Sequence, residues 1–171
     1  MVDIAFFSFL PIWGLRNGLE EAFAVTLLTV FVAGNIVLQY PLGWLADARG
    51  YRFGMLVCGL LCLLAPIAAP HLVQLPLLLV AVLFFWGGAA WGIYSIALAA
   101  LGVRFRGASL AAANAVFFIA FEVANILGPP AAGGALDLWP RHGLMVLMGL
   151  FGAAFLVLLA ARYRSVQTTE G

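Results

Sequence analysis

The uncharged stretch LPLLLVAVLFFWGGAAWGIYSIALAALGV, residues 75–103, decides what kind of fold this sequence adopts. One helical crossing of a hydrocarbon core about 30 Å thick needs roughly 20 apolar residues, and this stretch is longer than that. Of the 171 residues in the chain, 65% are hydrophobic and only 9% are charged. A soluble domain carries about 25% charged residues, so a soluble enzyme, a nucleic-acid-binding domain and a disordered tail are excluded. The sequence predicts an all-α integral membrane protein.

Charged residues and turn residues divide the chain into six apolar segments within one domain. Open sheets cannot span lipid and these runs are too long for barrel strands, so we expect helices. The first segment has fifteen residues and reaches roughly 22 Å as a helix, so we expect the chain to begin part-way along a helix. The expected crossings are residues 1–15, 22–46, 53–69, 75–103, 107–136 and 143–161, followed by a cytoplasmic tail at 162–171.

The arginines set the expected orientation, because basic residues are enriched in cytoplasmic loops. All eight basic residues are arginines, and Arg16 and Arg141 fall on one side of a six-crossing zigzag. The remaining arginines fall on the other side: Arg49, Arg52, Arg104, Arg106, Arg162 and Arg164. The pattern predicts a multi-pass protein of the plasma or inner membrane with both ends in the cytoplasm.

Polar side chains are concentrated on the first, second, fourth and fifth crossings, while the third and sixth are almost purely apolar. The order is therefore polar, polar, apolar in each triplet of crossings. Transporters built as inverted repeats consist of two such triplets, the second inverted relative to the first. We therefore expect a 3+3 inverted repeat, with chance as the alternative origin of the pattern. Asp3 on the first crossing and Trp91 and Tyr94 on the fourth are cavity candidates. For Trp91, Tyr94 and Trp86, which lies on the same crossing, ordinary packing is the open alternative.

The fifth crossing carries the most informative polar stripe. Asn114, Glu122 and Asn125 fall with Phe118 and Phe121 within about 120° of one helix face. A charged residue near the middle of a crossing costs roughly 2.5–3.5 kcal/mol on insertion scales, so such residues normally face a cavity or a partner. We expect Glu122 to load and release a proton. A protonated Glu122 that only forms a hydrogen bond between helices is the structural alternative.

The stretch GWLADARGYR, residues 43–52, resembles the signature loop of the major facilitator superfamily. Gly43, Asp47, Gly50 and Arg52 match that signature, while Arg49 supplies a basic charge one place late. The resemblance implies the C-terminal six-helix half of a twelve-helix, drug- or sugar-transporter-like fold. It also implies a charge latch on the cytoplasmic side, with Asp47 pairing with Arg49 or Arg52. We expect Gly43 to end the second helix or to let it pack tightly, and an ordinary solvated turn is the alternative to a latch.

The resemblance further implies a secondary transporter that works by alternating access, with its solute site near the midplane. The other wall of this solute site then belongs to a missing N-terminal half or to a second copy of the chain. No arginine lies in the middle of a crossing, so a neutral or cationic small solute, coupled to protons, is expected.

The two cysteines, Cys58 and Cys62, are too few for a structural zinc site, and we expect neither a metal nor a cofactor. A non-transporting truncated fragment or a partner-binding half is the main alternative. An intramembrane enzyme is a remote one, because Ser95 and the Glu20–Glu21 pair lack the required companions.

Overall fold

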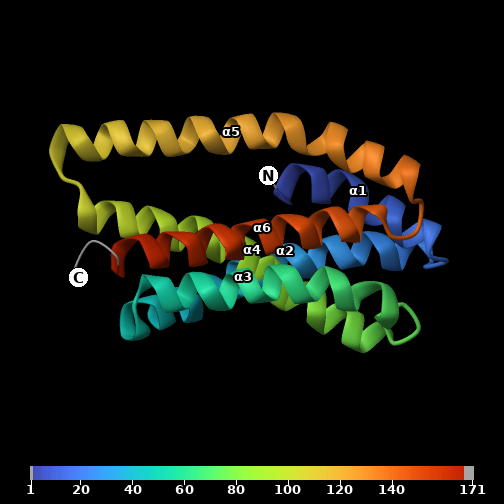
Figure 1. Ribbon diagram of the computed structural model, residues 1–171. Helices are drawn as coiled ribbons and strands as arrows, with labels where there is room; N and C mark the ends of the chain where they lie inside the picture. The colour runs from blue at the N-terminus through green and yellow to red at the C-terminus, as the bar shows by residue number, and fades with distance from the viewer. Residues whose placement is uncertain (1, 168–171) are drawn as a thin grey trace.

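The computed structural model describes residues 2–167 of the chain, with side chains from residue 6 to residue 162. Its helices run alongside one another in a single bundle (Figure 1). The side chain of Asp3, which was a cavity candidate, lies outside the described residues, as does the end of the expected cytoplasmic tail, residues 168–171. The backbone of Asp3 belongs to the first helix.

The described residues form helices and no strand, which confirms the all-helical fold. The elements are α1 (Val2–Arg16), α2 (Glu21–Arg49), α3 (Tyr51–Ala68), the 3-10 turn η1 (Ala69–Leu72), α4 (Pro76–Arg104), α5 (Gly107–Leu138) and α6 (Gly143–Gln167). Between residues 2 and 167, five helices are long and apolar enough to cross a membrane: α2, α3 with η1, α4, α5 and α6. Helix α1, with 15 residues, is shorter than a full crossing, as the sequence predicts.

Two helices extend three or more residues beyond their predicted ends. Helix α2 continues through Asp47 to Arg49, so the expected loop between the second and third crossings is reduced to Gly50. Gly50 has a φ of +90°, a left-handed conformation that glycine adopts without a steric penalty. Helix α6 continues to Gln167, so the first residues of the expected tail are helical. In both places the sequence lacks a glycine or proline that would end the helix earlier.

The core lies where α1, α2 and α4 meet. The Phe6 ring centroid lies 4.7 Å from that of Phe31 and 4.4 Å from that of Trp86, and all three side chains are fully buried. Helices α2 and α4 approach so closely that a Cβ atom added at Gly34 or Gly87 would strike the backbone of the other helix. Small residues permit this close approach between membrane helices.

Hydrogen bonds attach α1 to the opposite end of the chain. The indole Nε1–H of Trp13 donates to the carbonyl oxygen of Arg141 at 2.9 Å, and the guanidinium of Arg16 donates to the carbonyl oxygen of Leu136 at 2.7 Å. Trp13 is fully buried. Although α1 is short, it is therefore held between α2 and the turn that joins α5 to α6.

Helix α5 runs along one side of the bundle and stands apart from α4 over its first half (Figure 1). Its buried side chains all lie in its second half, beginning at Asn125 and ending at Leu136. Val116, Ile119 and Ile126 are exposed on its outer side. This arrangement leaves α4 and the first half of α5 in contact mainly through aromatic side chains.

Candidate functional site

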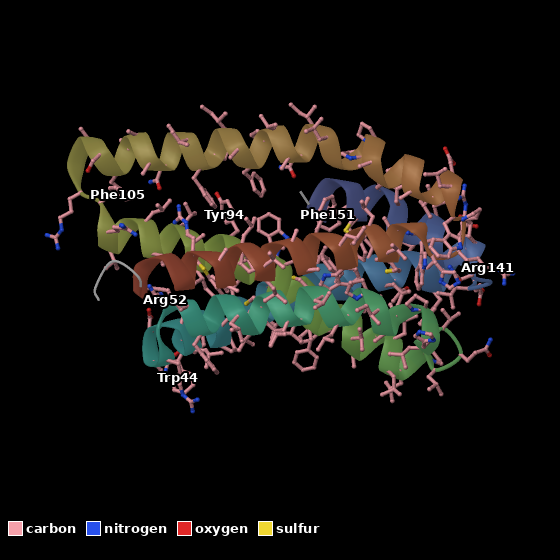
Figure 2. The ribbon with its side chains drawn as sticks, viewed as in Figure 1. Trp44, Arg52, Tyr94, Phe105, Arg141 and Phe151 are labelled. Carbon is pink, nitrogen blue, oxygen red and sulfur yellow. The ribbon has the colours of Figure 1, made fainter. Side chains whose placement is uncertain are left out.

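Four aromatic side chains meet between α4 and α5, and we call them the α4–α5 cluster: Trp91, Tyr94, Phe117 and Phe121. Tyr94 is its centre, with ring centroids at 6.1 Å from Trp91, 5.5 Å from Phe117 and 5.1 Å from Phe121. Figure 2 shows Tyr94 extending from α4 toward α5. The pairs within each helix are three and four residues apart, a spacing that places both members on one helix face.

Two buried polar atoms on these helices make no hydrogen bond within the described part of the chain: Nε1 of Trp91 on α4 and Oδ1 of Asn125 on α5. Asn125 is only 7% exposed and follows Phe121 by about one helical turn on α5. An unpaired buried donor or acceptor costs about 1–3 kcal/mol. Helices α4 and α5 therefore carry aromatic surface together with one unpartnered donor on α4 and one unpartnered acceptor on α5.

The structure brings together only part of the predicted stripe on α5. Asn125 is buried, and Phe121 is half-buried in the α4–α5 cluster, whereas Asn114, Phe118 and Glu122 are exposed. Glu122 lies at the midpoint of α5, which spans Gly107 to Leu138. Its side chain is exposed, and no hydrogen bond or ion pair joins its carboxyl group to the described residues.

The signature motif occupies the junction of α2 and α3. Asp47 and Arg49 belong to the last turn of α2, and the guanidinium of Arg49 lies 5.5 Å from the ring centroid of Phe53. A Cβ atom at Gly43 would meet nothing within 4 Å, and α2 runs straight through this position. The expectation that Gly43 ends the helix or packs tightly is therefore wrong. Arg52 lies in the first turn of α3.

Sequence reasoning missed one member of the cluster and left another residue undecided. Phe117 contacts Tyr94, although the predicted stripe included only Phe118 and Phe121. Its spacing of four residues from Phe121 is the signal that identifies it. Trp86, for which lining a cavity and packing were both open, belongs to the core with Phe6. Among the described residues, no group of three or more His, Cys, Asp or Glu side chains is placed to hold a metal ion.

The long apolar helices and the buried core define a multi-pass helical membrane protein. The sequence matches the Major Facilitator Superfamily over residues 1–170, so the chain belongs to this family. It is 26% identical over 164 residues to the uncharacterized MFS-type transporter YfkF of Bacillus subtilis, covering 94% of this chain and 41% of YfkF. It is 24% identical over 153 residues to the uncharacterized MFS-type transporter YcaD of Salmonella paratyphi B, covering 90% of this chain and 39% of YcaD. No solved structure matches the chain.

The chain spans about two fifths of the length of these curated relatives. A six-helix half of a twelve-helix fold has this relative size, and the half-fold interpretation of the signature motif agrees with it. The family membership also favours a transport protein over an intramembrane enzyme.

Proposed function

We propose that this chain forms one six-helix half of a secondary transporter that moves a small solute across the membrane by alternating access. The family membership and the relative length support this proposal. Exposed apolar faces on α2 and α5 also support it, since Tyr40 is 83% exposed and Ile126 is 71% exposed. In the proposal, these faces meet an N-terminal half or a second copy, and both chain ends lie in the cytoplasm.

The proposal includes an inverted repeat in which α1–α3 and α4–α6 are equivalent units. In such a repeat α1 corresponds to α4, α2 to α5 and α3 to α6. The contact between α2 and α4 then corresponds to a contact between α5 and α1. Both of these contacts are among the main helix pairings of the bundle. Two triplets related by an axis in the membrane plane place a solute site near the midplane, and the α4–α5 cluster belongs to that region in this proposal.

The single observation that carries the proposed solute site is the pair of unpartnered buried atoms, Trp91 Nε1 and Asn125 Oδ1. The Trp91 ring contacts Tyr94, and Asn125 follows Phe121 by about one helical turn. A neutral or cationic solute suits this half, because aromatic faces attract cations and no arginine lies in the middle of a crossing. Asn114 and Asp3 remain cavity candidates in the proposal. Glu122 is the proposed proton-coupling residue, since a carboxyl at mid-helix depth can exchange a proton with either side as the cavity alternates.

Glu122→Gln in the assembled transporter tests this function. Proteoliposomes with an imposed pH gradient are first screened with labelled neutral and monocationic solutes, and a transported solute is then measured with the variant. We expect accumulation against the gradient to be lost while exchange is retained, because glutamine keeps the shape but cannot titrate. Glu21→Gln is the matched control, since Glu21 is exposed in the first turn of α2. Accumulation by the Glu122 variant equal to that of the control would refute the coupling role.

The proposal also assigns a gating role to the motif at the α2–α3 junction. Asp47, Arg49 and Arg52 lie around Gly50 and are proposed to hold the cytoplasmic side closed. A separate measurement tests whether a half is sufficient: the isolated monomer in proteoliposomes should show no saturable, coupled uptake, because it supplies only one wall of the site. Such uptake by the monomer would overturn the half-transporter assignment, while a non-transporting fragment predicts no uptake in any assembly.

A further inference from the structure

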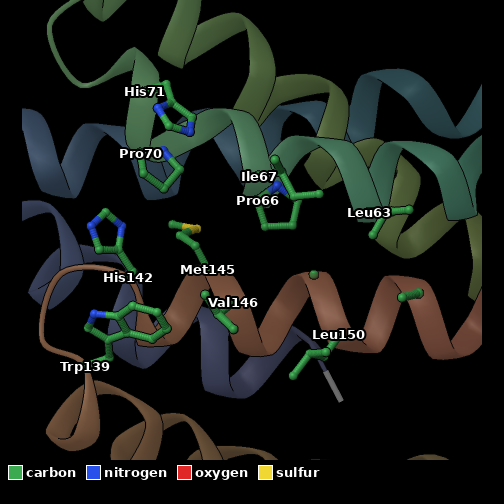
Figure 3. Close-up of a pocket in the computed structure, with 12 residues that line it drawn as sticks. Leu63, Pro66, Ile67, Pro70, His71, Trp139, His142, Met145, Val146 and Leu150 are labelled. Atoms are coloured by element: carbon green, nitrogen blue, oxygen red, sulfur yellow. The ribbon is translucent and has the colours of Figure 1, made fainter.

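A groove of about 420 Å³ lies on the surface of the bundle, between α3 with η1 on one side and α6 with the α5–α6 turn on the other. Figure 3 shows its two walls and the side chains along them. One end is lined by aliphatic side chains such as Leu63 and Leu150. The other end holds His71, Trp139 and His142. No acidic side chain lines the groove.

The groove exists because α3 and α6 diverge toward the histidine end. At Gly152 the helices touch, since an added Cβ atom would lie 2.7 Å from the carbonyl oxygen of Cys62. At Gly149, about one turn earlier on α6, the nearest atoms to such a Cβ are at 3.9 Å on Pro66 and 4.0 Å on Ile67. The absence of a side chain at Gly149 therefore leaves the floor of the groove open.

The rim of the groove is the lipid-facing surface of two helices long and apolar enough to cross a membrane. Ile67 is 54% exposed and Leu150 is 61% exposed on this rim, so acyl chains of the bilayer are the natural neighbours of the aliphatic end. At the other end, both histidines are exposed, and the ring of Trp139 lies 6.0 Å from that of His142. Tryptophan is enriched at the membrane–water interface, and imidazole N–H groups donate hydrogen bonds to phosphate oxygens.

We propose that this groove binds one phospholipid, with an acyl chain along Leu63 and Leu150 and the phosphate at His71 and His142. The charge pattern fits an anionic headgroup, because the polar end presents donors and Arg141 is adjacent to His142 in the chain. Asp137 lies in the last turn of α5 and is exposed, but it does not line the groove. This site is separate from the proposed solute site on α4 and α5, so it does not depend on the proposed function.

Native mass spectrometry of the detergent-purified full chain tests the proposal. The probes are dioleoylphosphatidylglycerol, dioleoylglycerol, which lacks the phosphate, and glycerol phosphate, which lacks the acyl chains. We expect one retained phosphatidylglycerol, weaker retention of dioleoylglycerol and no adduct with glycerol phosphate. The double variant H71F/H142F keeps two aromatic rings but removes the imidazole donors. It should weaken phosphatidylglycerol binding by at least about tenfold, as expected for the loss of a hydrogen bond to a charged group, and should leave dioleoylglycerol unchanged.

Filling the groove tests the acyl-chain half of the proposal. Gly149→Leu should abolish the retained lipid, and Ala153→Leu at the aliphatic end should reduce it if Gly149→Leu does not fold. Gly102→Leu is the control, because a Cβ atom there meets nothing within 4 Å. The proposal is overturned if both groove variants retain the lipid as Gly102→Leu does, or if H71F/H142F binds phosphatidylglycerol as tightly as the parent chain.

Discussion

The contact between α2 and α4 makes a strong prediction for the substitution Gly87→Ala. A methyl group at Gly87 would overlap the backbone carbonyl of Phe31, and one at Gly34 would overlap the carbonyl of Phe84. In both cases the obstacle is backbone, so no rotamer change relieves the overlap. The helices have to separate, which disturbs the packing of Phe31 against Trp86 in the core.

The size of the effect follows from two opposing contributions. Overpacking a tightly packed site costs typically 1–3 kcal/mol, and a contact that only backbone movement can relieve belongs at the upper end of that range. Replacing glycine by alanine in a helix interior contributes about 1 kcal/mol of stabilisation. We therefore expect the free energy of unfolding to fall by about 2 kcal/mol in Gly87→Ala.

Gly43→Ala is the matched control, since Gly43 lies inside α2 and a Cβ atom there meets nothing within 4 Å. Its free energy of unfolding should rise by about 0.5–1 kcal/mol. Reversible unfolding in mixed detergent micelles measures both variants, and Gly34→Ala should behave like Gly87→Ala. If Gly87→Ala is as stable as Gly43→Ala, the close approach of α2 and α4 does not exist and the core description is wrong.

Three further predictions concern single positions. Trp13→Phe removes the hydrogen bond to the carbonyl of Arg141 and should lower the free energy of unfolding by about 1 kcal/mol in the same assay; an unchanged value would mean that this bond does not hold α1. In a protein from which Cys58 and Cys62 have been removed, a cysteine in place of His142 should react with an impermeant maleimide added to intact cells, while a cysteine in place of Arg49 should not. The reverse pattern would contradict the proposed orientation. Trp91→Phe removes a buried donor that has no partner. It should leave the free energy of unfolding unchanged or raise it, by about 1–3 kcal/mol at most, and a clear decrease would reveal a partner for the indole.

The crossings were predictable because their length is set by the membrane and their ends by charges. The start of α5 at Gly107 agrees with the prediction, and so does the start of α6 at Gly143. The charges of Asp47 and Arg49 did not predict where α2 ends. Residues 45–49 are all compatible with a helix, so the helix continues up to Gly50. Charges predict where a crossing leaves the membrane but not where the helix itself stops. Helix α2 ends just before Gly50, whereas α5 continues through Pro129 and Pro130.

The candidate site was only partly predictable, because periodicity gives the angles between side chains but not the direction of a neighbouring helix. The predicted stripe on α5 contains Phe121, Asn125 and Glu122, yet the contacts with Tyr94 favour the edge that includes Phe117. At 3.6 residues per turn, the midpoint of Phe117 and Phe121 is rotated by roughly 65° from the centre of the predicted stripe. Glu122 therefore lies outside the part of the α5 surface that contacts Tyr94. That rotation depends on how α5 packs against α1 and α6, which no local pattern contains.

The exposed position of Glu122 links the fold to the proposed assembly. A charged side chain at mid-crossing depth costs roughly 2.5–3.5 kcal/mol when it faces lipid, and Glu122 lies at the midpoint of α5 on a side that this chain does not cover. The neighbouring exposed residues Val116 and Ile126 suit an apolar environment, so the carboxyl is the unusual group on this surface. A second six-helix unit against α5 would replace lipid by protein or by a hydrated path around this one group. The proposed coupling role of Glu122 would then belong to the assembled transporter rather than to this half.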